Sequence, residues 1–325
     1  MSAPVTSGER EQPALPKLSA GPARSQIGGE AGGRPAWEAT LGLAVGGALL
    51  GYVAIVLGWA VTEAAGIADG RSLGPVALYT AVLATIYSLI VAAASDVRDG
   101  IWDRAIVRGA LAAVVGAVVG AAAGALSYLL FDQLQQAQDP GAPRFYLLRA
   151  LAWSAFGVGI GLVGGLTERS GRKAVNGLIG GLIGGAIGGV LFHYVGQRVD
   201  GDAEARLIGL AAIGICTGAA IGLVEGARRQ AWLRVVAGGM AGKEFILYHD
   251  LTTVGSAPKC QITLIKDPGA QPFHAQIAVD GPRRIVSAID GAPVGVNGAP
   301  VRSRPLRSGD QIQIGATTLL YQERD

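Results

Sequence analysis

Six apolar segments, each close to the length of a membrane span, constrain this chain more than any other feature of its sequence. They cover residues 39–62, 73–94, 105–131, 145–166, 174–195 and 207–224. An α-helix needs about 20 apolar residues to cross some 30 Å of hydrocarbon, and each segment comes close to that length. We therefore predict an all-α membrane bundle of six helices, with the alternative that one pair of segments forms a re-entrant hairpin.

The distribution of charge fits a membrane domain with soluble parts on either side. Only 16% of the 325 residues are charged, against about a quarter in soluble globular chains. Residues 1–36 are rich in Pro, Gly, Ser, Ala and Glu and show no apolar period, which predicts a disordered N-terminal tail. The tail also lacks the pattern of a cleavable signal peptide, so we expect the first apolar segment to be retained as a span.

Lysine and arginine residues between the spans predict the orientation of the chain. Twelve such residues would lie on one side of the membrane and four on the other. The twelve are Arg10, Lys17, Arg24, Arg34, Arg98, Arg104, Arg169, Arg172, Lys173, Arg228, Arg229 and Arg234, and the four are Arg71, Arg144, Arg198 and Arg206. Short loops that are rich in Lys and Arg stay in the cytoplasm. We therefore predict a protein of the plasma (inner) membrane with both termini in the cytoplasm.

Glycines recur every four residues within spans three to six. The columns are Gly116, Gly120 and Gly124; Gly157, Gly161 and Gly165; Gly177, Gly181, Gly185 and Gly189; Gly180, Gly184 and Gly188; and Gly214, Gly218 and Gly222. This interval places them on one helix face, where glycine lets two backbones approach closely. The columns favour tight packing of a bundle, and sliding faces of a gate are the alternative. Similar motifs at 161–165 and 222–226 leave open whether spans three and four are duplicated as spans five and six or only share a Gly/Ala-rich composition.

The sequence offers no set of residues that would support catalysis or metal binding. The three histidines are scattered, and the two cysteines are far apart in the chain. Neither a Ser/His/Asp set nor a phosphate-binding loop ahead of a helix is present. The middles of the spans hold hydroxyl residues and one cysteine, and hydroxyls in helices usually bond back to the preceding turn. We therefore predict a protein that is not an enzyme, with no cofactor, no metal and no nucleic-acid partner.

The C-terminal residues change from helical to strand periodicity. Short runs at 245–248, 252–255, 262–265, 275–279, 284–289, 311–315 and 318–321 are separated by Gly, Pro and Asp. Such spacing predicts an all-β sandwich over residues 243–325. Residues 227–242 contain Trp232 and three arginines, which predicts a juxtamembrane linker at the level of the lipid headgroups. The predicted domains are thus 1–36, 37–226, 227–242 and 243–325.

Short motifs in the C-terminal residues occur in a recognisable order. They are Thr253-Val254-Gly255, Ile262-Thr263-Leu264, His274-Ala275-Gln276-Ile277, Val296-Asn297-Gly298 and Leu306-Arg307-Ser308-Gly309-Asp310-Gln311-Ile312-Gln313-Ile314-Gly315. Order and spacing resemble the forkhead-associated (FHA) family over residues 243–323. The resemblance implies an FHA-like sandwich that binds other proteins. It also implies structural roles for Gly255, His274, Gly298, Gly309 and Asp310, with His274 bracing a loop and tight turns at Asn297-Gly298 and Gly309-Asp310.

The chain departs from the FHA pattern where the family binds its ligand. The resemblance implies that an Arg, a Ser and an Asn on loops at one end of the sandwich would contact a phosphothreonine peptide, but these positions hold Ser256, Gln271 and Ala292. A phosphate dianion is best bound by a bidentate Arg, which Ser256 cannot replace. We therefore predict a binding surface that includes Ser256, Lys259, Gln271, Ala292 and Asn297 and does not bind phosphothreonine in the usual way.

These features lead to one main hypothesis and one alternative. The main hypothesis is a membrane-anchored protein-interaction and signalling scaffold, whose partners are the lipid bilayer and either a cytoplasmic protein or another copy of the FHA-like domain. Apolar contacts would come from Pro272, Phe273 and Val294. Substitute cations for a phosphate would be Lys259, Arg302 and Arg304. The alternative is a channel or small-solute transporter that the FHA-like domain regulates.

Overall fold

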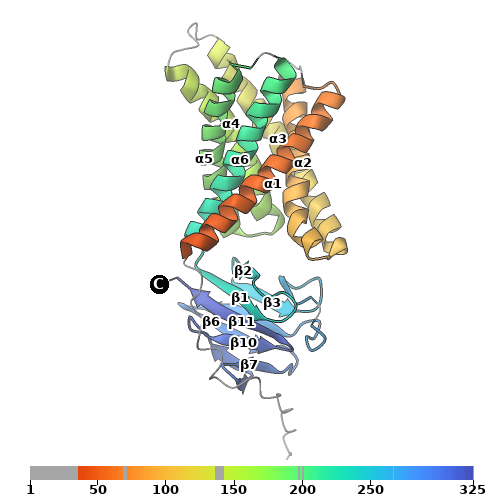
Figure 1. The fold of residues 1–325 in the computed structure, drawn as a ribbon, viewed down its shortest axis with the longest axis vertical. Helices are drawn as coiled ribbons and strands as arrows, with labels where there is room; N and C mark the ends of the chain where they lie inside the picture. Colours follow the sequence, from red (N-terminus) through yellow and green to blue (C-terminus); the bar gives the residue numbers. More distant parts are fainter. Residues whose placement is uncertain are drawn as a thin grey trace, which may run out of the picture. The chain divides into compact units, whose positions relative to one another are not determined.

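The structure is a computed structural model that describes residues 36–68, 72–135, 143–196, 198–199, 201–265 and 267–324. These residues form six helices followed by eleven strands (Figure 1), and they divide into two compact units, one holding the helices and the other most of the strands. The helices are α1 (Ala36–Ala64), α2 (Leu73–Arg98), α3 (Trp102–Gln135), α4 (Pro143–Thr167), α5 (Gly171–Gly196) and α6 (Asp202–Arg228). The predicted tail lies outside the described residues except for Ala36.

Each predicted apolar segment lies within one continuous helix. All six helices are long and apolar enough to cross a membrane. Helix α6 has 27 residues and is longer than the apolar segment 207–224, because the helix continues through polar residues at both of its ends. The prediction of six apolar helices of membrane-spanning length is therefore confirmed.

Neighbouring helices run antiparallel and touch through the glycine columns. Gly157 on α4 lies against Gly181 on α5, and a Cβ added to either glycine would overlap the carbonyl oxygen of the other. Gly47 on α1 and Gly218 on α6 are related in the same way. Further reciprocal pairs are Gly161 with Gly177 and Gly51 with Gly214. Backbones this close form Cα–H···O contacts, which add to van der Waals packing where lipid supplies no hydrophobic drive.

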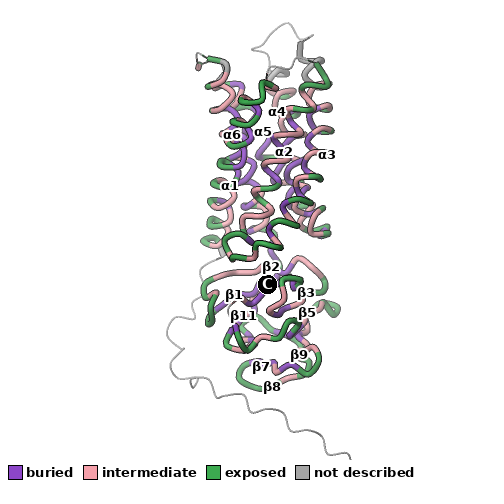
Figure 2. The backbone as a smooth tube through the Cα atoms, turned by 90° about the vertical axis from the view of Figure 1, so that its right-hand side faces the viewer, coloured by how far each residue is buried: buried purple, intermediate pink, exposed green. Residues whose placement is uncertain are grey.

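Helix α5 uses its two glycine columns for two different neighbours. A Cβ added to Gly181 or Gly185 would collide with α4, whereas one added to Gly184 or Gly188 would collide with α6. The column on α3 lies in the same manner against α2. Figure 2 shows buried and exposed stretches alternating along the helices, as expected when one face packs on its neighbours. The expectation that the glycine columns lie at helix contacts is confirmed.

The strands form two sheets. The first has the order β2-β1-β11-β10-β7-β8 and the second the order β4-β3-β5-β6-β9. The strands are β1 (Ala231–Ala237), β2 (Glu244–Ile246), β3 (Leu251–Gly255), β4 (Ile262–Thr263), β5 (Ala275–Asp280), β6 (Arg283–Ala288), β7 (Val294–Val296), β8 (Ala299–Val301), β9 (Ser303–Pro305), β10 (Gln311–Ile314) and β11 (Thr317–Glu323). Burial alternates along β10 and β11, so that Ile312 and Leu319 lie in the core. Pro300 and Pro305 lie on the edge strands β8 and β9, where a missing N–H is tolerated.

The predicted juxtamembrane linker is wrong over strand β1. Residues Ala231–Ala237 pair with β11 in the first sheet, so the β-domain begins before Lys243. The side chain of Trp232 is buried in the β-domain, and its Nε1–H donates to Oε1 of Gln322 at 2.9 Å. An apolar strand that follows basic residues has the same composition as an interfacial segment, and only its pairing with β11 distinguishes the two.

Candidate interaction surface on the β-sandwich

Three loops meet at one end of the sandwich, and we call them the apical loops: the β3–β4 loop (256–261), the β4–β5 loop (264–274) and the β6–β7 loop (289–293). His274 joins two of them and is fully buried. Its Nδ1 accepts the N–H of Gln271 at 3.0 Å, and its Nε2 lies 3.0 Å from the carbonyl oxygen of Pro293. Because Nδ1 accepts, Nε2 carries the proton and donates. The geometry agrees with the bracing role that the resemblance implies for this histidine.

The polar groups around Ser256 are occupied by bonds between the apical loops. The amide of Ser256 donates to the carbonyl of Gln271 at 2.9 Å, and its Oγ donates to the carbonyl of Ala270 at 3.0 Å. The amide of Ala257 donates to the carbonyl of Pro272 at 3.0 Å. Gly255 permits this contact, because a Cβ there would lie 2.8 Å from the carbonyl carbon of Pro272. Donors that could face a phosphate are thus engaged within the domain.

The structure exposes only part of the predicted surface. Gln271 and Pro272 are exposed, and Phe273 is 42% exposed. In contrast, the side chains of Ala292 and Val294 are 3% and 1% exposed, so neither can contribute a contact at the surface. The prediction that Ala292 and Val294 contribute to the binding surface is therefore wrong. Both side chains pack inward, behind the loop that His274 braces.

Asn297 lies at the other end of β7 from the apical loops. It has a φ of 54° and is followed by Gly298 at 79°, which forms the expected tight turn between β7 and β8. Its Oδ1 accepts the N–H of Gln311 at 2.9 Å, and its Nδ2 donates to Oδ1 of Asp310 at 2.7 Å. Asp310 also accepts the N–H of Arg307 at 2.7 Å. Asn297 therefore braces two turns and does not join Ser256 and Gln271 in one site.

Asp267 anchors the β4–β5 loop, and sequence reasoning did not identify it. Its carboxylate accepts the hydroxyl of Thr317 at 2.6 Å and the amides of Ala316 and Gly269 at 3.1 and 3.0 Å. Burial alone would raise the pKa of this carboxyl, but the hydrogen bonds outweigh burial and hold the pKa below its ordinary value. The Asp-Pro-Gly sequence predicts a turn, but it does not reveal the partner of Asp267, because Thr317 lies 50 residues further along the chain.

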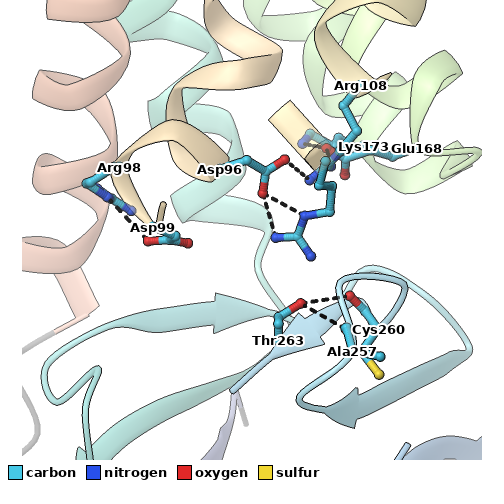
Figure 3. A network of polar contacts seen from close by, with 10 residues as sticks. Asp96, Arg98, Asp99, Arg108, Glu168, Lys173, Ala257, Cys260 and Thr263 are labelled. Carbon is cyan, nitrogen blue, oxygen red and sulfur yellow. Dashed lines mark hydrogen bonds and ion pairs between the residues drawn. The ribbon is translucent and has the colours of Figure 1, made fainter. Parts of the chain in front are cut away.

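The helical unit contains a second polar cluster, at the ends of α2 and α4 and the starts of α3 and α5 (Figure 3). Asp96 is fully buried; Nε of Arg104 lies 2.7 Å from its Oδ1, and Nη1 of Arg108 lies 3.2 Å from its Oδ2. Arg108 also reaches Glu168 at 2.5 Å, and Lys173 reaches Glu168 at 2.7 Å. Burial would raise the pKa of Glu168, but Lys173 and Arg108 hold it below its ordinary value. This network joins α2, α3, α5 and the loop that follows α4.

At the opposite ends of these helices, one ion pair joins the first helix to the last. Nε of Arg206 on α6 lies 2.7 Å from Oε1 of Glu63 on α1, and Nη2 lies 3.1 Å from Oε2. This bidentate geometry is the strongest form of an arginine–carboxylate contact. The ion pair thus links α1 to α6. In the sequence, Glu63 and Arg206 appear only as two charges that flank separate spans.

Most hydroxyls within the spans bond to backbone carbonyls, as expected. Thr85 donates to Ala81 at 2.7 Å, and Ser154 donates to Ala150 at 2.6 Å. Ser88 and Thr217 differ, since their buried hydroxyls have no hydrogen-bond partner among the described residues. Both lie against a glycine column, Ser88 facing Gly116 and Thr217 facing Gly184.

Comparison with known proteins concerns the C-terminal residues. Residues 234–325 match the sequence profile of the family described as "Inner membrane component of T3SS, cytoplasmic domain". The expected motifs lie on strands β3, β4, β5, β7 and β10 and on the turns and loops next to them. The C-terminal domain has an FHA-type fold. The profile covers less than half of the chain and leaves the helical region unassigned.

Several solved FHA domains are similar to the same part of the chain. The FHA domain of CT664 from Chlamydia trachomatis is 24% identical, with 30% of this chain and 99% of that one covered and a TM-score of 0.28. An FHA domain of an Arabidopsis thaliana protein is 22% identical, with coverages of 30% and 87% and a TM-score of 0.28. A domain studied for phosphothreonine-dependent FHA interactions is 22% identical, with coverages of 30% and 98% and a TM-score of 0.27. No curated protein sequence matches the chain significantly.

Proposed function

We propose that this protein is a membrane-anchored interaction scaffold whose FHA-type domain binds a protein partner in the cytoplasm without reading phosphothreonine in the family's usual way. The observation that supports the proposal is which groups of the apical loops are hydrogen-bonded and which are exposed. The amide and hydroxyl of Ser256 are bonded to the neighbouring loop, while Pro272 and Phe273 are exposed beside them. Such a surface suits an apolar contact with a protein and not the desolvation of a dianion.

The cytoplasmic location is inferred from two independent features. The short loops with more Lys and Arg lie on the side of the membrane that carries both termini. The family that matches residues 234–325 is described as a cytoplasmic domain of an inner membrane component, which supports the same side for the C-terminal domain of this chain. We assign it no catalytic role.

Two exposed positions on the β-domain allow a matched test of the interaction. The full-length protein would be purified in mild detergent, and co-purifying proteins would be quantified by mass spectrometry for the wild type and two variants. Phe273→Glu changes the apical loops, and Val279→Glu is the control, since Val279 is 36% exposed on β5 beyond them. We expect Phe273→Glu alone to reduce a specific partner by about tenfold, a loss of some 1.4 kcal/mol. Equal recovery with both variants would contradict the assigned surface.

The mode of recognition needs a separate test. Residues 230–325 contain β1 and all the later strands and form most of one compact unit, so they are a suitable soluble fragment. We expect this fragment to show no preference for a phosphothreonine peptide library over the unphosphorylated library. Binding that disappears on dephosphorylation would overturn this part of the proposal.

A regulated channel or small-solute transporter remains the alternative function. The unpartnered hydroxyls of Ser88 and Thr217 are the features that favour it, because a polar path needs polar groups within the spans. The backbone contacts at both glycine columns of α5 favour a closed, packed bundle instead. Solute flux into liposomes that contain the purified protein separates the two functions, and flux that falls in Thr217→Val would support the channel.

A further inference from the structure

Two exposed cations lie at opposite edges of the second sheet, close to the apical loops. Lys259 precedes β4, which is one edge strand, and Arg302 precedes β9, which is the other. Both residues are exposed, and neither side chain forms an ion pair or hydrogen bond within the part of the chain that the structure describes. They are therefore available to a partner, unlike the donors around Ser256.

Strand register ties Arg302 to the apical loops. Its carbonyl accepts the N–H of Ala288 at 2.8 Å, and Ala288 is opposite Ala275, the first residue of β5. The next residue, Ile289, donates its N–H to the carbonyl of His274 at 3.0 Å. Arg302 thus lies at the same end of the sheet as Phe273, which directly precedes His274.

Phe273 stands between the two cations as a preformed apolar anchor. The preceding residue, Pro272, is held by the N–H of Ala257 at 3.0 Å and by Sγ of Cys260 at 3.2 Å, both donating to its carbonyl. A side chain on a loop already ordered in this way loses little conformational entropy when it binds. Exposed aromatic and arginine side chains are also the types that most often dominate binding energies.

The separation of the cations decides which anion they fit. The sheet has five strands, so four spacings of about 4.8 Å separate its edge strands β4 and β9, and Lys259 and Arg302 are roughly 19 Å apart across the sheet. A single phosphate cannot contact both. An extended segment of about six residues spans this distance at some 3.3 Å per residue. Asp290 on the β6–β7 loop is also exposed, and its carboxylate would repel an acidic segment that passed close to it.

We propose that the apical surface binds an extended, unphosphorylated acidic segment of a protein, with an apolar side chain on Phe273 and carboxylates beside Lys259 and Arg302. The proposal rests on the interaction function proposed above and names the chemistry of the partner. Attraction of carboxylates to the cations at the two edges sets the spacing of the charges along the segment, whereas Phe273 supplies the central contact.

The test uses the full-length protein in detergent and four synthetic peptide sets. Each peptide has about 12 residues, enough to exceed the spacing between the cations when extended. One set alternates Asp or Glu with Leu or Phe, a second has Asn or Gln instead of the acids, a third has Lys instead of the acids, and a fourth adds phosphothreonine to the neutral set. We expect the acidic set to bind best and to weaken as salt concentration rises, because exposed charges are screened.

Variants locate the binding on the surface. Arg302→Gln and Lys259→Gln should each weaken acidic peptides by about 2–5-fold, the range expected for an exposed ion pair. The control is Arg283→Gln, since Arg283 is also exposed but begins β6 at the end away from the apical loops. It should leave the affinity unchanged.

Other results would overturn the proposal. If the wild type binds acidic and neutral peptides equally well and Phe273→Glu binds neither, the acidic preference is refuted and the interaction function stands. A loss in Arg283→Gln as large as in Arg302→Gln would show general attraction to a cationic domain, and an absence of binding by any set would also contradict the inference. Binding of the phosphothreonine set alone would overturn both this inference and the proposed mode of recognition.

Discussion

Replacing Gly185 by alanine tests whether the glycine columns hold the bundle together. Gly185 lies on α5 against α4, and an added Cβ would lie 2.5 Å from the carbonyl oxygen of Trp153 and 2.9 Å from Cα of Ser154. Non-bonded heavy atoms pack at about 3.5–4.0 Å, so the two helices must separate by roughly 1 Å to accept one methyl group. The separation would also weaken the neighbouring contact between Gly157 and Gly181.

The size of the effect follows from a matched control on α1. A Cβ added to Gly46 would have nothing within 4 Å. Alanine is favoured over glycine in a helix by about 1 kcal/mol at either position, whereas overpacking costs about 1–3 kcal/mol at Gly185 alone. We therefore expect the free energy of unfolding of Gly185→Ala to be about 1–3 kcal/mol lower than that of Gly46→Ala. Gly185→Leu should destabilise the bundle further, because its larger side chain must enter the same contact.

The free energies of unfolding would be measured in mixtures of a mild detergent and sodium dodecyl sulfate. Tryptophan fluorescence includes a signal from the α4–α5 contact, since Trp153, one of five tryptophans, is beside Gly185. If Gly185→Ala and Gly46→Ala are equally stable, the column does not limit the approach of α4 and α5 and the reasoning is refuted. A larger loss for Gly46→Ala would show that α1 has a neighbour on that face.

Three further predictions concern the charged groups and the orientation. Asp267→Asn should lower the free energy of unfolding of the β-domain by about 2–4 kcal/mol, because buried donors lose a charged acceptor. The pKa of Asp267 is lowered in the folded state, so its contribution to stability is complete above about pH 4 and is lost as the pH falls through the folded pKa. The variant should therefore lose that part of the acid sensitivity in denaturant titrations. Asp96→Asn should destabilise the helical unit by about 3 kcal/mol, as Arg104 and Arg108 lose their shared carboxylate. The control Asp99→Asn should change stability by less than about 1 kcal/mol, because its partner is exposed. Reporter proteins fused at residues 36 and 325 should both report the cytoplasm, and a signal from the other side at either point would contradict the predicted orientation.

The main elements could be predicted because their signals are local. Apolar length identified the six helices, and the four-residue interval of glycines identified the contact faces before any partner was known. The turn at Asn297-Gly298 was also predictable, since few residues other than glycine and asparagine adopt positive φ. Strands β7, β8 and β9 were missed, because Gly295, Pro300 and Pro305 interrupt them and no period of two is visible. Strands β7 and β9 pair with the longer strands β10 and β6, and β8 pairs with β7.

The sequence by itself determined the membrane bundle, the faces on which its helices touch and the FHA-type order of motifs, since each depends on residues a few positions apart. Only the tertiary structure decided which polar groups remain available. The sequence places Ser256 in a predicted binding surface, but its hydroxyl and amide are bonded to residues 270 and 271. Asp96 and Glu168 form one network although 72 positions separate them. Such pairings arise when separate elements pack, because burial requires each polar group to find a partner wherever the fold brings one.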